Sequence, residues 1–192
     1  MIDRWGRAKV GVALGSVVLA CSSSTSGELD AGPPCELGCQ DKTGVRAIRE
    51  MMKLIYNLTL QGKPVGEQSQ AIECPRGGRA FIHGAATSNA DQGTTEVKLT
   101  YEAEACGYTQ RDDDPEETYD VVLSGKIAQA GVLAVQPGSS TALVMRSDAV
   151  TLTGTVREPK IPYRVDGCKL EMTQSGNRLT ATLCGRVVGL DL

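Results

Sequence analysis

The chain of 192 residues carries 20 Lys and Arg against 23 Asp and Glu, a formal net charge of −3. This balance lacks the basic surplus that attracts phosphate backbones, so it gives no support to nucleic-acid binding. Aromatic residues make up only 4% of the chain, and a folded core therefore has to be built from aliphatic side chains and alanine. The length is enough for one domain with a sizeable core.

The first 20 residues have the layout of a secretory signal peptide. Arg4, Arg7 and Lys9 precede an uncharged, mostly apolar run from Val10 to Ala20, which is shorter than the roughly 20 residues that span a bilayer. We therefore expect residues 1–20 to be removed, with three basic residues and one acidic residue among them. The remaining chain then has 17 basic and 22 acidic residues, a net charge of −5.

The residues Val18-Leu19-Ala20-Cys21 resemble the lipobox of bacterial lipoproteins. The resemblance implies cleavage before Cys21, acylation of that cysteine with palmitate among its chains and, because Ser22 follows, sorting to the outer membrane. Two or more acyl chains are enough for stable anchoring. We thus expect the lipid bilayer as a partner, the cell envelope as the location and residues 21–40 as a lipidated, flexible tether. The alternative is an ordinary secretory signal with Cys21 as an unmodified thiol.

Seven cysteines are an odd number, but assigning Cys21 to lipid leaves an even set of six. In an exported chain such a set predicts three disulfides, which can be connected in about fifteen ways. Zinc would need closely paired cysteines or histidine partners, whereas His83 is the only histidine. We therefore expect disulfides and no metal or other cofactor.

The positions of four cysteines favour two hairpin-closing disulfides. Cys74 and Cys106 are symmetric about the first expected hairpin turn, and Cys168 and Cys184 are symmetric about the last. The expected strand faces argue against these pairs. Directly opposed residues should point to the same side of the sheet, whereas the two cysteines of each pair are expected on opposite sides. A bulge in each hairpin would restore the match.

Elimination then leaves Cys35–Cys39 as the third pair. The alternative connectivity joins Cys74 to Cys168 and Cys106 to Cys184 across the sheet. Mapping of the disulfide-linked peptides decides between the two sets.

One stretch, residues 41–61, has the periodicity of a helix. Its apolar residues recur at intervals of three or four and form a stripe: Val45, Ile48, Met51, Met52, Ile55 and Leu58. The opposite face carries polar residues: Arg46, Arg49, Glu50, Lys53 and Asn57. Asp41 or Thr43 is placed to cap the start, and Gly62 and Pro64 to end it. Because the stripe lacks Trp and Phe anchors, we expect it to pack on a sheet rather than on a membrane surface.

From Ala80 onward the apolar residues alternate with polar ones, which is typical of half-buried antiparallel strands. We expect a mainly β fold, with a curved, half-barrel-like meander over 79–188 packed on the helix in one domain, 41–192. A change of phase at Ser147-Asp148 predicts a bulge there. The six expected strands lie near 79–87, 95–106, 117–129, 140–157, 161–173 and 178–188.

Four glycines share the pattern of an apolar residue, a variable one, glycine, a variable one and an apolar or small residue: Gly84, Gly125, Gly154 and Gly185. Glycine inside a strand favours bending or a close backbone approach, so we expect a curved sheet whose concave face accepts the helix. With these repeats and Cys184-Gly185, residues 70–190 resemble small, β-rich, disulfide-containing lipoproteins of Gram-negative bacteria. That resemblance implies no particular activity.

The sequence offers little for catalysis. His83 could act as a general base, but it has no companion nucleophile motif. The glycine-rich stretch 74–79 lacks the Gly-Lys-Ser/Thr of a phosphate loop, so we expect a turn. The acidic loop 111–117 lacks the spacing of a calcium loop, so we expect a solvated hairpin tip.

We therefore expect a membrane-anchored, non-catalytic envelope lipoprotein with neither catalytic nor metal-binding residues. Its concave sheet face could hold an apolar ligand or a lipid. The alternative is a surface or periplasmic module that binds a protein partner through its polar strand faces.

Overall fold

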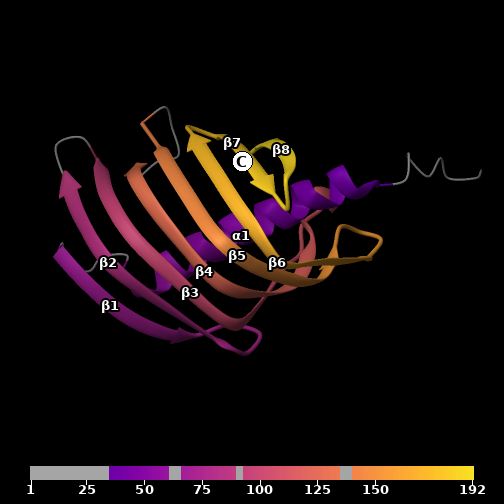
Figure 1. The fold of residues 1–192 in the computed structure, drawn as a ribbon, viewed down its shortest axis with the longest axis horizontal. Helices are drawn as coiled ribbons and strands as arrows, with labels where there is room; N and C mark the ends of the chain where they lie inside the picture. Colours follow the sequence, from indigo (N-terminus) through magenta and orange to yellow (C-terminus); the bar gives the residue numbers. More distant parts are fainter. Residues whose placement is uncertain (1–34, 61–65, 90–92, 135–139) are drawn as a thin grey trace, which may run out of the picture. The chain divides into compact units, whose positions relative to one another are not determined.

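The computed structural model describes residues 35–60, 66–89, 93–134 and 140–192. They belong to one compact unit, Cys35–Leu192. Its eight strands are antiparallel and lie across the sheet in the order of the sequence, and Figure 1 shows one helix crossing a face of this curved, open sheet. The expected mainly β meander on one helix is therefore confirmed. The expected signal peptide, Cys21, most of the tether, Gly62 and Pro64 lie outside the described residues.

The described unit begins with helix α1, Leu37–Thr59, and continues with the meander. A short 3-10 helix, Pro115–Glu117, precedes the fourth strand. The strands are β1 (Gly66–Glu73), β2 (Arg79–Asn89), β3 (Thr94–Gln110), β4 (Tyr119–Ala134), β5 (Ala142–Val156), β6 (Ile161–Ser175), β7 (Arg178–Leu183) and β8 (Arg186–Asp191).

Helix α1 packs its apolar stripe against the inner face of the sheet. Val45, Ile48, Met52 and Ile55 are at most 1% exposed and join the inward-facing strand residues in one core. The stripe recurs every three or four residues, so this burial follows from the sequence. Leu58 is an exception, because it is 57% exposed. Within the described part of the chain, no helix is long and apolar enough to cross a membrane.

The start of α1 differs from the expected one. The helix begins at Leu37, and Glu36 at its N-cap makes no side-chain capping hydrogen bond. Asp41 and Thr43 lie inside the helix and are fully buried, so neither is the expected cap. Polar side chains at these positions face the sheet rather than the helix terminus, which the sequence pattern does not reveal.

The described residues form eight strands rather than the six expected, and the difference arises because periodicity missed one strand and merged two others. Strand β1 pairs with β2 at the edge of the sheet, but most of its residues are exposed, so it lacks the alternation that marks a half-buried strand. The expected strand 178–188 is instead the hairpin of β7 and β8. Its turn is Cys184-Gly185, with φ of 52° and 79°, and Gly185 is therefore a turn residue rather than a strand glycine.

The other three repeated glycines lie inside strands and allow neighbouring backbones to approach closely. Gly84, Gly125 and Gly154 have φ between 129° and 145°, a region that L-residues rarely adopt. At Gly84, a Cβ atom would overlap the carbonyl oxygen of Lys98 on the adjacent strand. These positions therefore require glycine, and they lie in the curved strands β2, β4 and β5 of Figure 1.

The structure places three cysteine pairs at disulfide distance. They are Cys35 with Cys39, Cys74 with Cys106, and Cys168 with Cys184, with Cα separations of 5.4, 5.3 and 4.9 Å.

The two long-range pairs close hairpins despite the objection from strand faces. The register of β3 shifts between Ala103 and Cys106, which turns Cys106 inward as the expected bulge would. The rule that opposed strand residues face the same way does not apply to Cys184, because it lies in the β7–β8 turn. Its N–H donates to the carbonyl of Lys169. The register of β5 likewise shifts between Ser147 and Val150, where the phase of the sequence changes.

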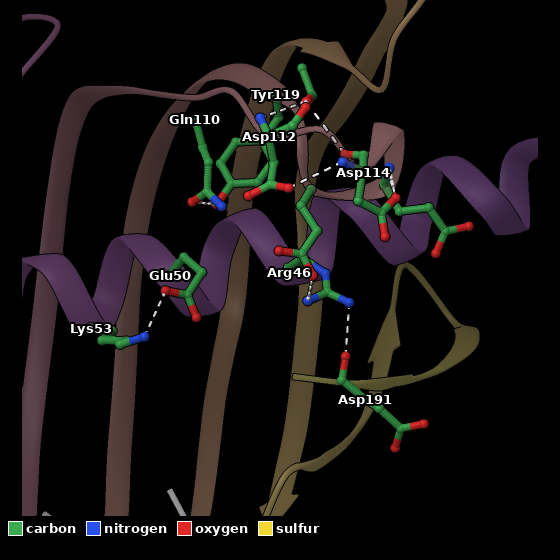
Figure 2. A network of polar contacts seen from close by, with 11 residues as sticks. Arg46, Glu50, Lys53, Gln110, Asp112, Asp114, Tyr119 and Asp191 are labelled. Atoms are coloured by element: carbon green, nitrogen blue, oxygen red, sulfur yellow. Dashed lines mark hydrogen bonds and ion pairs between the residues drawn. The ribbon is translucent and has the colours of Figure 1, made fainter. Parts of the chain in front are cut away.

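Polar side chains tie α1 to the far end of the meander. The Asp41 carboxylate accepts hydrogen bonds from Arg186 Nε and Nη2 at 2.6 and 2.9 Å and from the Tyr163 hydroxyl at 2.7 Å. Arg46 donates to Glu117 Oε1 at 2.7 Å and to the carbonyl of Asp191 at 2.8 Å (Figure 2). These contacts hold the first half of the helix against the sheet.

The acidic loop is an exposed hairpin tip over residues 111–115, as expected, but its last two residues, Glu116 and Glu117, are partly buried. Asp114 Oδ1 caps the 3-10 helix by accepting from the N–H of Glu116 at 2.8 Å (Figure 2). Glu116 pairs with Arg157 at 2.9 Å, and Glu117 pairs with Arg46 of α1. Two of its carboxylates thus neutralise neighbouring arginines.

Candidate functional site

A cleft of about 680 Å³ lies beside the C-terminal half of α1, where the helix stops covering the ends of the central strands. Its walls combine charged, amide, hydroxyl and apolar side chains. They are Arg49, Glu50, Lys53, Tyr56 and Asn57 of α1, Thr95 and Tyr101 of β3, Gln129, Leu133 and Ala134 of β4, Thr141, Gln174, Asn177 and Leu192.

Arg49 is the charged group at the inner wall of this cleft. It is 8% exposed, and its Nε donates to Gln174 Oε1 at 2.8 Å. Gln174 is held in turn, because its Nε2 donates to the carbonyl of Gly176 at 2.9 Å. Burial lowers the pKa of the Arg49 guanidinium, while Glu50 and Tyr101 oppose that shift. Among the described residues, no carboxylate lies within ion-pair distance of Arg49.

Tyr101 brings a buried hydroxyl to the same wall. The residue is 2% exposed, and its hydroxyl has no hydrogen-bond partner among the described residues. Burial raises the pKa of this phenol, and the nearby Arg49 guanidinium opposes the rise. The hydroxyl therefore stays protonated at neutral pH and can donate a hydrogen bond.

Two further polar residues complete the interior. Gln129 of β4 is 5% exposed, and within the described ranges no hydrogen bond to its amide is found. Thr141 is 3% exposed, and its hydroxyl accepts from the N–H of Ala134 at 3.4 Å. The amide of Gln129 is thus a second polar group in the cleft that has no protein partner.

The mouth of the cleft carries an ion pair. Lys53 Nζ lies 3.1 Å from Glu50 Oε2, and Figure 2 shows this contact along α1. Because Glu50 and Lys53 pair with each other, Arg49 is the charged side chain of the lining that has no ionic partner among the described residues. The site is therefore electrostatically suited to a negatively charged group.

The residues considered for chemistry from the sequence lie elsewhere. His83 sits in β2 opposite Ser69 and Thr100, away from the cleft. Residues 74–78 form the β1–β2 turn, as expected for the stretch 74–79, and Arg79 begins β2. Cys21 lies outside the described residues, and the described residues contain no group of side chains arranged to hold a metal ion.

Sequence reasoning assigned Arg49 to the polar face of the helix and so missed the site. The helix is flanked by sheet on more than one side, and Arg49 lies next to Ile48 at the margin of the stripe. Comparison of the chain with protein-family models, with curated proteins and with solved structures finds no match.

Proposed function

We propose that this chain is a membrane-anchored, non-catalytic lipoprotein of the cell envelope whose β-domain binds a small molecule in the cleft beside α1. The proposed anchor is inferred from the residue pattern of 1–21. It consists of acylation at Cys21 and implies an outer-membrane location. The binding role rests on one observation, a cleft that contains a buried hydroxyl, that of Tyr101, without a hydrogen-bond partner among the described residues. Small-molecule sites commonly measure about 300–1,000 Å³ and combine apolar walls with a few convergent polar groups.

The position of the helix decides where a ligand can bind. The apolar stripe of α1 fills the middle of the inner sheet face, so that face offers no open apolar trough. Among the described residues, the cleft beside the second half of the helix offers open space of about 680 Å³. Its titratable mouth residues, Glu50 and Lys53, are paired with each other, which supports binding rather than acid–base catalysis.

Native mass spectrometry of the full chain after gentle extraction from envelopes tests the binding role. Ala134→Trp fills the cleft, whereas Ala130→Trp places the same bulk on an exposed position of the same strand. We expect wild type and Ala130→Trp to carry a bound mass that Ala134→Trp lacks. An equal bound mass on all three, or none on wild type, would contradict the proposal.

Metabolic labelling with palmitate tests the anchor independently. We expect label on wild type and none on Cys21→Ser. Unlabelled wild type would remove the anchoring proposal and leave the cleft unaffected.

A further inference from the structure

The cleft contains donors in excess of acceptors. Arg49 uses Nε toward Gln174, whereas no hydrogen bond joins its two terminal nitrogens to the described residues. The Tyr101 hydroxyl is a buried donor without an acceptor among the described residues. A buried donor that stays unsatisfied costs about 1–3 kcal/mol, so the Tyr101 hydroxyl, with the unused terminal N–H groups of Arg49 beside it, favours a ligand that supplies acceptors.

A buried guanidinium also needs a compensating charge. Arg49 is 8% exposed, and Glu50, an acidic residue of the cleft wall, pairs with Lys53. Desolvated cations in proteins are normally paired, because an uncompensated one is strongly destabilising. The planar guanidinium matches the two oxygens of a carboxylate or phosphate.

The orientation of Arg49 is already set for such a contact. Gln174 accepts from Arg49 Nε and itself donates to the carbonyl of Gly176. The Nε edge of the guanidinium is therefore fixed, while its terminal nitrogens make no hydrogen bond to the described residues. A preorganised donor loses less conformational entropy on binding than a mobile one. The guanidinium is therefore held in one orientation, with its terminal N–H groups left to donate to a ligand.

The outer walls are suited to a hydrocarbon. Leu133, Leu192 and Tyr56 are partly buried and pack against the core beside the polar groups. A ligand that joins an anionic head to an apolar chain would satisfy both surfaces.

We propose that the cleft binds the anionic head of a small amphiphile, a carboxylate or a phosphate monoester, with Arg49 as its ion-pair partner and Tyr101 as a hydrogen-bond donor. This inference deepens the proposed function and depends on it. The apolar chain of the ligand lies along Leu133 and Tyr56.

Isothermal titration of the full chain carrying Cys21→Ser tests this ligand class without acyl chains on the protein. The probes are octanoate, octyl phosphate, 1-octanol and acetate. We expect octanoate or octyl phosphate to bind at least about 10-fold more tightly than octanol and than acetate, because only the amphiphilic anions satisfy both surfaces.

Two variants test whether Tyr101 and Arg49 contact the anionic head of the ligand. Tyr101→Phe removes only the hydroxyl and should weaken binding of the anion about 10-fold, and Arg49→Lys should do so at least as strongly because the fork is lost. Tyr119→Phe is the matched control, because its hydroxyl contacts Gln110 outside the cleft. It should bind like wild type.

The outcomes separate this inference from the proposed function. Octanol binding as tightly as the anions, with Ala134→Trp abolishing both, would overturn the anion site and keep a ligand-binding cleft. Unchanged anion affinity in Tyr101→Phe and Arg49→Lys would also overturn it. Acetate binding as tightly as octanoate would overturn the amphiphile. Octyl phosphate binding in place of octanoate, or the reverse, identifies the head group and supports the proposal.

Discussion

Asp41 and Arg186 are 145 residues apart in the chain, yet they form a two-pronged ion pair that joins α1 to β8. The carboxylate is fully buried, whereas the Arg186 side chain is 38% exposed. Tyr163 donates a third hydrogen bond to the same carboxylate. One acidic side chain thus links the helix, β6 and β8.

Removal of Asp41 should destabilise the domain strongly. Asp41→Ala leaves the buried Tyr163 hydroxyl and the inner side of Arg186 without an acceptor, and we expect a loss of about 3 kcal/mol in the free energy of unfolding. Urea denaturation measures it. The neighbouring exposed Lys42→Ala is the control and should change that free energy by less than about 0.5 kcal/mol. Equal stability of the two variants would show that the ion pair does not hold the helix.

Two glycines of α1 should respond oppositely to alanine. A Cβ on Gly44 would lie 2.6 Å from Tyr163 Cε1, while a Cβ on Gly38 would meet nothing within 4 Å. Alanine gains up to about 1 kcal/mol in helix propensity, but overpacking costs about 1–3 kcal/mol. We therefore expect Gly38→Ala to raise the unfolding temperature and Gly44→Ala to lower it. Thermal unfolding decides, and a Tyr163→Ala background should make Gly44→Ala stabilising.

The disulfides should contribute in the order of the chain lengths that they enclose. The separations are 32 residues for Cys74–Cys106, 16 for Cys168–Cys184 and 4 for Cys35–Cys39. The chain-entropy relation then predicts losses of about 4, 3 and 2 kcal/mol for the corresponding double-serine variants, measured by denaturation.

Peptide mapping of the unreduced protein checks the connectivity behind this order. We expect the fragments 74–106, 168–184 and 35–39 to be recovered as linked pairs. A link between Cys74 and Cys168 would contradict the pairing.

Stability should fall at alkaline pH because of buried tyrosines. Burial raises the pKa of Tyr101, Tyr119 and Tyr163 above the ordinary value of 10.0, and the hydrogen bond to Asp41 adds to the shift at Tyr163. A group whose pKa is higher in the folded state stabilises fully below its unfolded pKa. That stabilisation is lost as pH rises from the unfolded pKa through the folded one.

Denaturation at a series of pH values measures this effect. We expect the free energy of unfolding to be nearly constant up to about pH 9 and to decline above about pH 10. Tyr119→Phe should make the decline shallower. A free energy that stays constant to pH 12 would contradict the assignment.

Periodicity predicted those parts of the fold that alternate cleanly between buried and exposed residues. The stripe of α1 and the inward residues of β3 to β6 carry this signal, and their placement follows from it. Strand β1 carries no such signal, because both of its faces are largely exposed at the sheet edge. The turn at Cys184-Gly185 is not visible in the periodicity, because apolar and polar residues alternate in the same way in the strands on both sides of it.

The cleft could not be predicted from the sequence, for a different reason. A polar residue on a helix normally indicates a solvent-facing side, and Arg49 was assigned accordingly. Its burial depends on where Gln174 and Tyr101 lie, on strands far away in sequence. Such a site arises from tertiary arrangement, so single-residue patterns do not contain it.

The strand order β1 to β8 has a consequence for the time course of folding. Each strand pairs with its neighbour in sequence, so hairpins can form successively as the chain emerges from its N-terminal end. Helix α1 emerges first, but its contacts with Arg186 and with the carbonyl of Asp191 must wait for the final strand. A chain interrupted before residue 186 would leave Asp41 without its cation and the helix incompletely held. Formation of β8 therefore supplies contacts that α1 needs to be fully held against the sheet.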